Sequence, residues 1–323
     1  MSFSTVSLTD VRRVETQLRT QAMRFVLGNI LSSPIRSTRL FREWFQLPMN
    51  YARIIELPLT QLLLNASKDD AILDISSPKL LALSLALNGY EGVVAADMED
   101  YFVDDFEIYK HYSKLSMKTS VFDAASEIPF ASSCFDKIFS VSVLEHIPGD
   151  GDILAMKEML RVLKPSGTLV FTLPAFPYYV EEWTVSKHYW KSVQNQRGET
   201  FFQRRYDQER LMKTLFAQGG VVQEVILVAE KPISPPRIGS NGIMLHNSYL
   251  IDKVPLARLF MALSRRLKCL PFIQYLAELT VSRRCHYLTA DWSDPNIRQV
   301  VVKMTKLTDS DPGYADVELE PGA

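Results

Sequence analysis

The chain has 323 residues, 47% of them hydrophobic, and a formal net charge of -1. This length and hydrophobic content suffice for one large core, or for one core with a smaller appendage. The near balance of charge gives no general attraction to nucleic acid, so a DNA- or RNA-binding role is not favoured.

The cysteines and the first residues favour a reducing, cytoplasmic environment. Cys134, Cys269 and Cys285 are widely spaced, so we predict neither a disulfide framework nor a metal site. The opening residues lack the basic-then-apolar pattern of a signal peptide. No apolar run is long enough for a membrane-spanning helix.

Residues 1–50 are amphipathic and rich in arginine, and we predict that they form an N-terminal helical extension. A second helix is expected over residues 51–65. From residue 71 onward, short apolar runs alternate with helical patterns, which is typical of βαβ units and a parallel sheet.

Seven segments have the composition of strands. With helices expected between them, they predict an α/β, Rossmann-like fold with a seven-stranded, mostly parallel sheet covered on both faces. The strand candidates are residues 71–75, 92–97, 116–124, 135–143, 167–174, 221–230 and 297–305.

The last two strand candidates read as a β-pair that is interrupted by an insertion, residues 231–296. A structureless loop of that length is unusual, so we expect the insertion to carry its own helices. The core then comprises residues 51–230 and a last strand within 297–308. Residues 309–323 are acidic, and we predict a disordered tail there.

An aspartate lies at the end of each of the first three strand candidates: Asp74, Asp97 and Asp123. In an open parallel sheet, ligands bind at the carboxyl ends of the strands. Three carboxylates there suit a ligand that has hydroxyls, an amino group and a cationic centre. The chain has no P-loop lysine motif and no glycine-rich pyrophosphate turn.

One long stretch resembles a known family. The sequence AASEIPFASSCFDKIFSVSVLEHIPGDGDILAMKEMLRVLKPSGTLVFTLP is similar to the second half of small-molecule class I methyltransferases. The matching motifs are LEH at residues 144–146 and RVLKPSG at residues 161–167. The resemblance runs from about Tyr51 to Glu230, with a final strand near residues 297–305. It implies S-adenosylmethionine as the cofactor.

The resemblance also implies roles for individual residues. Asp97, with Met98 beside it, would accept hydrogen bonds from the ribose hydroxyls. Asp123 would accept one from the adenine amino group, next to the Ala124 backbone N–H. Hydrogen bonds to carboxylates are charge-assisted and therefore among the stronger ones.

The methionine part of the cofactor would lie nearer the first and fourth strands. The resemblance implies that Asp74 and the turn after it, with Ser76 and Ser77, face this part. It places Ser140 just after the fourth strand, where its backbone would help to hold the amino-acid end.

The first loop departs from the family pattern Asp-x-Gly-x-Gly-x-Gly, since Ser76, Pro78 and Leu80 replace the three glycines. Glycine permits positive φ and close backbone approach to a ligand. Pro78 removes a backbone donor but is tolerated at a helix start, and Lys79 adds charge there. Two interpretations stay open: a rebuilt loop that still binds cofactor, or a non-catalytic scaffold or partner subunit.

Four further residues are candidates with alternatives. Glu145 or His146 would act as general base near the transferred methyl, or would serve only to start a helix or to pack. Arg53 and Glu56 share one face of a predicted helix. They would contact the cofactor, or form a surface ion pair.

Two segments bear on the acceptor. The aromatic stretch 175–190, with His188, would form an apolar acceptor pocket or pack on its own sheet. Residues 254–279 combine apolar and basic positions, which suits a peripheral helix on an anionic membrane or a helix packed over the active site. The leading hypothesis is methyl transfer to a small organic or lipid-like acceptor.

Overall fold

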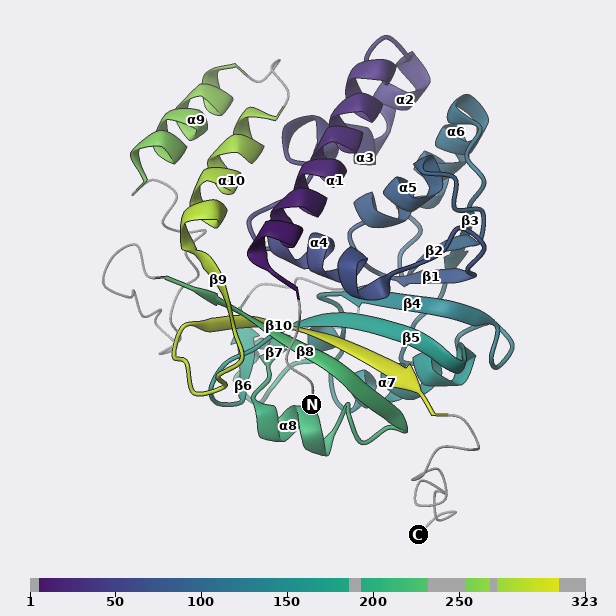
Figure 1. Cartoon of the computed structure of the whole chain (residues 1–323), viewed down its shortest axis with the longest axis vertical. Coiled ribbons are helices and arrows are strands. Elements are labelled where there is room, and N and C mark those ends of the chain that lie inside the picture. Colours follow the sequence, from purple (N-terminus) through teal and green to yellow (C-terminus); the bar gives the residue numbers. More distant parts are fainter. Residues whose placement is uncertain (1–5, 186–192, 232–253, 268–271, 308–323) are drawn as a thin grey trace.

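The computed structural model describes residues 6–185, 193–231, 254–267 and 272–307. Its centre is a sheet with the strand order β3-β2-β1-β4-β5-β10-β8-β9 (Figure 1). The strands β1 to β5 are parallel to one another, whereas β10 is antiparallel to both of its neighbours and β9 is antiparallel to β8. Their bounds are β1 (Ile72–Ile75), β2 (Val93–Asp97), β3 (Lys118–Val121), β4 (Phe135–Val141), β5 (Leu163–Pro174), β8 (Gly220–Glu230), β9 (His286–Thr289) and β10 (Ile297–Lys306).

The α/β class and the mostly parallel sheet are confirmed, but the expected number of strands was wrong. Within the described residues the sheet has eight strands, and the additional one is β9, inside the insertion that was expected to be helical. This four-residue strand pairs Tyr287 with Ala229 and Leu288 with Val228 of β8. So short a segment has little periodicity of its own, and its conformation depends on this pairing.

A separate two-stranded sheet also escaped the sequence pattern. It consists of β6 (Val180–Thr184) and β7 (Thr200–Arg205), which pair in antiparallel fashion. The strand β6 lies within the aromatic stretch that was expected to cover the acceptor. His188 and the acidic tail at 309–323 lie outside the described residues.

Helices cover both faces of the large sheet (Figure 1). On one face lie α1 (Leu8–Asn29), α2 (Ser33–Ser37), α3 (Arg39–Gln46), α4 (Arg53–Leu64), α5 (Leu80–Leu87) and α6 (Val103–Ser113). The other face carries α7 (Gly151–Val162) and α8 (Gln208–Lys213), and the pair α9 (Pro255–Arg266) and α10 (Ile273–Cys285) stands beside α1.

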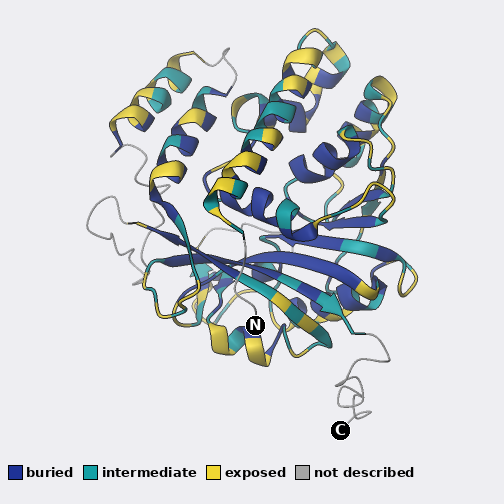
Figure 2. Ribbon diagram, in the orientation of Figure 1, coloured by how far each residue is buried: buried dark blue, intermediate teal, exposed yellow. Residues whose placement is uncertain are grey.

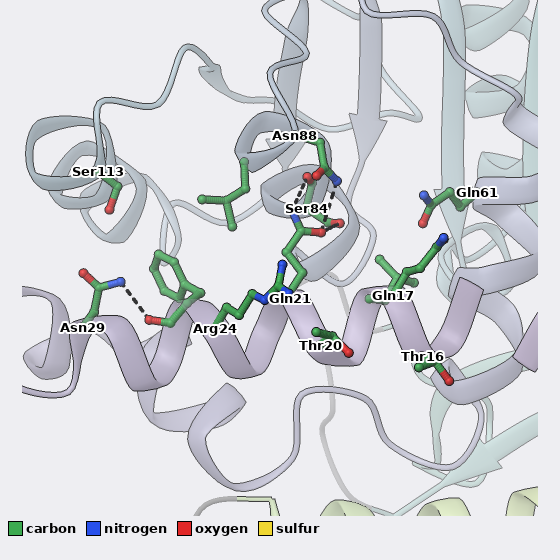
Figure 3. A pocket seen from close by; sticks show the side chains of 13 residues that line it. Thr16, Gln17, Thr20, Gln21, Arg24, Asn29, Gln61, Ser84, Asn88 and Ser113 are labelled. Atoms are coloured by element: carbon green, nitrogen blue, oxygen red, sulfur yellow. Dashed lines mark hydrogen bonds between the residues drawn. The ribbon is translucent and has the colours of Figure 1, made fainter. Parts of the chain in front are cut away.

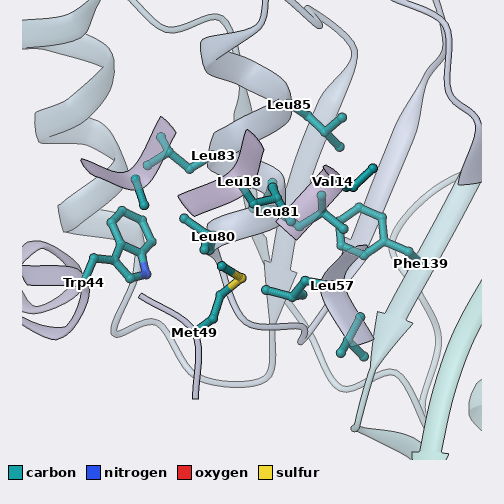
Figure 4. Close-up of a cluster of buried hydrophobic side chains, with 14 of the residues drawn as sticks. Val14, Leu18, Trp44, Met49, Leu57, Leu80, Leu81, Leu83, Leu85 and Phe139 are labelled. Carbon is teal, nitrogen blue, oxygen red and sulfur yellow. The ribbon is translucent and has the colours of Figure 1, made fainter. Parts of the chain in front are cut away.

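Alternation along β1 divides the core into two layers. Ile72 packs with the cluster under α1 and α5, whereas Leu73 and Ile75 pack with the cluster on the α7 side. Figure 4 shows the first cluster, in which Trp44 and Met49 meet the leucines of α5. The central strands β1, β4 and β10 are largely buried, whereas β3 and the first half of β8 are partly exposed (Figure 2). Burial on both faces is why the central strands read as continuous apolar runs.

The N-terminal helices and the insertion, both outside the family resemblance, pack against each other. Glu15 of α1 is buried, accepts a hydrogen bond from the Tyr275 hydroxyl and lies 3.1 Å from the guanidinium of Arg283. The Phe272 backbone N–H donates to the Phe45 carbonyl at 2.9 Å. These contacts fasten α10 to α1 and α3. Among the described helices, none has the length and apolar character needed to cross a bilayer.

We expect Leu81→Ala to destabilise the protein by about 2–5 kcal/mol, because its fully buried side chain would leave a cavity between α5 and the sheet. Leu31→Ala is the matched control, since Leu31 is 92% exposed and should change stability by less than about 0.5 kcal/mol. Urea denaturation measures both, and equal midpoints for the two variants would contradict this packing.

Candidate functional site

A pocket of about 590 Å³ opens at the carboxyl ends of the parallel strands. The chain passes from β1 to β2 on one side and later returns to β4 on the other side of β1. Loops that leave neighbouring strands in opposite directions open a crevice at such a switch point. The pocket is therefore where the topology predicts a ligand site.

Seven of the residues singled out from the sequence line this pocket. They come from five different parts of the chain, and the fold brings them together: Arg53, Ser76, Asp97, Met98, Asp123, Ala124 and His146. The other five lie beneath or beside it and are buried: Glu56, Asp74, Ser77, Ser140 and Glu145. A single sequence does not reveal which polar residues at strand ends are buried, so it could not separate the residues that line the pocket from those that lie beneath it.

The position expected for Ser140 was wrong. Strand β4 continues to Val141, so Ser140 lies inside the strand and is 1% exposed. Ser142 is the residue that follows the strand and lines the pocket, with a left-handed φ of 53°. The sequence did not indicate Ser142, because the apolar run continues to Val143, two residues beyond the end of β4.

The loop after β1 has no glycine but keeps a left-handed residue, Ser76, with φ 51°. Its backbone N–H donates to the Ala96 carbonyl at 2.9 Å. Ser77 turns inward, where its hydroxyl accepts a hydrogen bond from the Val141 N–H at 2.9 Å. Ser77 therefore fastens the loop to β4 and does not face the pocket. Neither serine caps α5, since the N-cap residue is Lys79.

Lys79 lies behind the pocket wall between two strand ends. Its ammonium donates to the Ala96 carbonyl at 2.8 Å and lies 3.2 Å from Asp97 Oδ2 and 3.6 Å from Asp74 Oδ2. Burial raises the pKa of Asp74 to about 6, although the positive charge of Lys79 opposes the shift. The sequence indicated a charge here, but not that the whole side chain folds inward.

Asp97 and Asp123 face the pocket from β2 and from the loop after β3. Asp97 Oδ1 accepts from the Glu99 N–H at 3.3 Å, and Asp123 Oδ1 accepts from the Ala125 N–H at 2.9 Å. Both contacts are short Asx-type turns that hold a carboxylate at a strand end. A role in such a turn leaves the outward side of each carboxylate directed at the pocket.

Arg53 and Glu56 do not form a surface ion pair. Glu56 is fully buried, pairs with Arg53, and accepts hydrogen bonds from the hydroxyls of Ser142 at 2.9 Å and Thr172 at 3.2 Å. Arg53 also donates to the Ser142 hydroxyl at 2.7 Å and lines the pocket. Glu56 thus fixes a guanidinium at the pocket wall, where it presents a positive charge.

Glu145 and His146 belong to the 3₁₀ turn η1 (Leu144–His146), directly after β4. His146 lines the pocket, and its Nδ1 lies 2.8 Å from the Phe202 carbonyl, which can only accept a hydrogen bond. Its Nε2 lies 3.7 Å from Glu145 Oε1. Burial raises the pKa of Glu145 to about 8, so this carboxyl is largely protonated at neutral pH.

Arg204 of β7 positions the loop that follows η1, and the sequence did not indicate it. It is 2% exposed and donates to the carbonyls of Ile147, at 2.5 Å, and Gly149. It also lies 3.7 Å from Asp152, which accepts from the Tyr206 hydroxyl at 2.7 Å. The β6–β7 sheet is therefore attached to the rim of the pocket.

A second hollow, of about 840 Å³, lies between α1 and the ends of α5 and α6 (Figure 3). Gln21 spans it from α1, donating to the Ser84 carbonyl at 3.0 Å and accepting from Asn88 at 3.2 Å. None of the residues predicted to bind cofactor lines this hollow. Across the described part of the chain, no cluster of three or more His, Cys, Asp or Glu residues is arranged to hold a metal ion.

Comparison with known proteins identifies the domain. Residues 73–171 match the family model described as a methyltransferase domain, and this span contains most of β1, all of β2 to β4 and most of β5. The chain therefore contains a methyltransferase domain, and this match supports S-adenosylmethionine as its cofactor. No curated protein sequence matches the chain.

Several solved structures are similar to the chain at low sequence identity. The [4+2]-cyclase SpnF is 16% identical, with a TM-score of 0.46 over 90% of this chain and 93% of that one. A methyltransferase from Methanosarcina mazei is 18% identical, with a TM-score of 0.41 over 76% and 95%. Phosphoethanolamine N-methyltransferase 2 from Haemonchus contortus is 16% identical, with a TM-score of 0.49 over 88% and 60%.

We expect Glu145→Gln to change the pH dependence of stability. The folded-state pKa of Glu145 is raised from 4.5 to about 8, so its contribution is most favourable below pH 4.5 and is lost as pH rises toward 8. The glutamine variant cannot ionise. The free energy of unfolding of the glutamine variant, relative to that of the wild-type protein, should therefore increase by on the order of a few kcal/mol between pH 5 and pH 8.

Urea denaturation of both proteins at pH 5, 6, 7 and 8 measures this difference. Asp74, whose pKa is raised in the same direction, is present in both proteins and cancels in the comparison. A difference that stays constant over this range would show that Glu145 is not a buried, neutral acid.

Proposed function

We propose that the chain transfers a methyl group from S-adenosylmethionine to a small organic or lipid-like acceptor. One observation carries the proposal: Asp97, Asp123 and Arg53, which come from separate elements, line a single pocket of about 590 Å³ in the methyltransferase domain. A pocket of this size suits a nucleoside-sized ligand with room for part of an acceptor.

The donor set fits the chemistry of the cofactor. Asp97 would accept hydrogen bonds from the ribose hydroxyls, and Asp123 would accept one from the adenine amino group, beside the Ala124 N–H. The Arg53 guanidinium would bind the carboxylate of the methionine part, a pairing that arginine favours. When bound, the cofactor supplies an electrophilic methyl group.

The remaining pocket residues bear on the acceptor. His146 would take a proton from the acceptor through Nε2, because its Nδ1 is directed to the Phe202 carbonyl. Glu145 is 1% exposed and does not line the pocket, so we assign it no contact with the acceptor. Ile147, Pro148 and Leu154 form an apolar wall that would exclude water from the reacting groups.

We expect S-adenosylhomocysteine to stabilise the protein against thermal unfolding. At a concentration about 100 times its dissociation constant, linkage gives roughly 2.7 kcal/mol. The double variant Asp97→Ala, Asp123→Ala should lose this stabilisation, because it removes the acceptors for the ribose and the adenine.

Asp69→Ala is the matched control, since Asp69 is exposed and lies before β1, at the opposite edge of the sheet. It should keep the full stabilisation. An unchanged melting temperature of the wild-type protein with ligand would instead favour a non-catalytic scaffold. Full stabilisation of the double variant would refute the assignment of these two aspartates.

The surface of α9 supports a lipid-like acceptor at a membrane. Leu256 and Leu259 are 51% and 53% exposed, and Leu267, just after the helix, is 39% exposed. Three arginines are exposed on the same helix: Arg258, Arg265 and Arg266. Residues 254–267 contain no acidic residue. Exposed leucines next to arginines are the features of a helix that lies on an anionic bilayer.

We expect the protein to co-sediment with vesicles of phosphatidylserine and phosphatidylcholine, but not with phosphatidylcholine alone. The variant Leu256→Ser, Leu259→Ser should lose this binding, because it removes the apolar contact with the bilayer. Leu31→Ser is the control, since it replaces a leucine that is even more exposed but lies after α1. Equal binding of both variants would rule out α9 as the contact surface.

A further inference from the structure

The ammonium of Lys79 lies among three oxygens. It donates a hydrogen bond to the Ala96 carbonyl at 2.8 Å, and it forms ion pairs with Asp97 Oδ2 at 3.2 Å and Asp74 Oδ2 at 3.6 Å. The ring of Phe102 covers the group, with its centroid 4.8 Å from the ammonium nitrogen.

Such an arrangement requires a reason, because a buried charge is costly unless it is paired. The Lys79 side chain is 0% exposed, as is that of Asp74, whereas that of Asp97 is 14% exposed. Without the lysine, two carboxylates would stand close together with no cation between them. Lys79 thus stabilises both strand ends, but only Asp97 reaches the pocket.

The carboxylate of Asp97 has acceptor positions that the protein itself does not use, and these are available to a ligand. A carboxylate offers about four lone-pair positions, two on each oxygen. The Lys79 ammonium lies against one side of Oδ2 at 3.2 Å, and the Glu99 N–H donates to Oδ1 at 3.3 Å. One position remains on each oxygen, which matches the two adjacent hydroxyls of a ribose.

We propose that Lys79 is a positioning residue for cofactor recognition, whose ammonium holds Asp97 in the orientation that presents these two acceptor positions to the ribose hydroxyls. The inference rests on the proposed function. The loop after β1 lacks glycine at all three positions of the family pattern, and Ser76 alone keeps a left-handed φ. Here a charged side chain, directed inward, orders the ends of β1 and β2.

The test compares two ligands, S-adenosylhomocysteine and its 2′,3′-dideoxy analogue, by titration calorimetry. The wild-type protein should bind the first at least about tenfold more tightly, since each hydrogen bond to a charged group contributes more than about 1.4 kcal/mol. Lys79→Met should bind S-adenosylhomocysteine about tenfold more weakly and should no longer distinguish the two ligands.

Two further variants keep the result interpretable. Lys79→Gln removes the charge but keeps a donor for the Ala96 carbonyl. It should show the same weaker binding and the same loss of discrimination, so it tests the proposal if the methionine variant does not fold. Lys164→Met breaks a more exposed ion pair, the one with Asp136 at 2.8 Å, at the other end of the sheet. This control should retain both the affinity and the discrimination.

A loss of affinity by the same factor for both ligands would show that Lys79 only stabilises the fold, and would overturn the proposal. Unchanged discrimination in either Lys79 variant would overturn it as well. If the wild-type protein binds neither ligand, the proposed function itself fails, and this inference with it. The two failures can be told apart, because failure of the proposed function is seen with the wild-type protein, whereas failure of this inference alone is seen only with the Lys79 variants.

Discussion

The reversal of strand order at β1 is the constraint on which the pocket depends. Strands β2 and β3 extend the sheet on one side of β1, and β4 and β5 extend it on the other. The loops after β1, β2, β3 and β4 therefore all reach one crevice. Residues as distant in sequence as Arg53 and Asp123 become neighbours of one cavity only because of this topology.

Burial then sorts the polar groups around that crevice into two kinds. Ser76, Asp97, Asp123 and His146 reach the pocket, and a second set supports them from below. Glu56 holds Arg53, and Lys79 bridges Asp74 and Asp97. In a medium of low dielectric constant such contacts are strong when complete and costly when broken, so the buried set limits the positions that the exposed set can adopt.

The segments outside the family resemblance surround the core and attach to it by specific contacts. The insertion reaches α1 through Tyr275 and Arg283, and it adds β9 to the sheet beside β8. The β6–β7 sheet reaches the pocket rim through Arg204. Each attachment is a polar contact between distant parts of the chain, which no local pattern would indicate.

The sequence by itself determined the fold class, most strands of the sheet and the domain family, because long apolar runs, helical periodicity and the LEH and RVLKPSG motifs are local signals. It also placed aspartates at strand ends. Only the tertiary structure decided which polar residues face the pocket: Ser142 in place of Ser140, and Lys79 folded inward beneath Asp97. The physical reason is that side-chain direction and burial at a strand end depend on the neighbouring strands, and these come from distant parts of the chain.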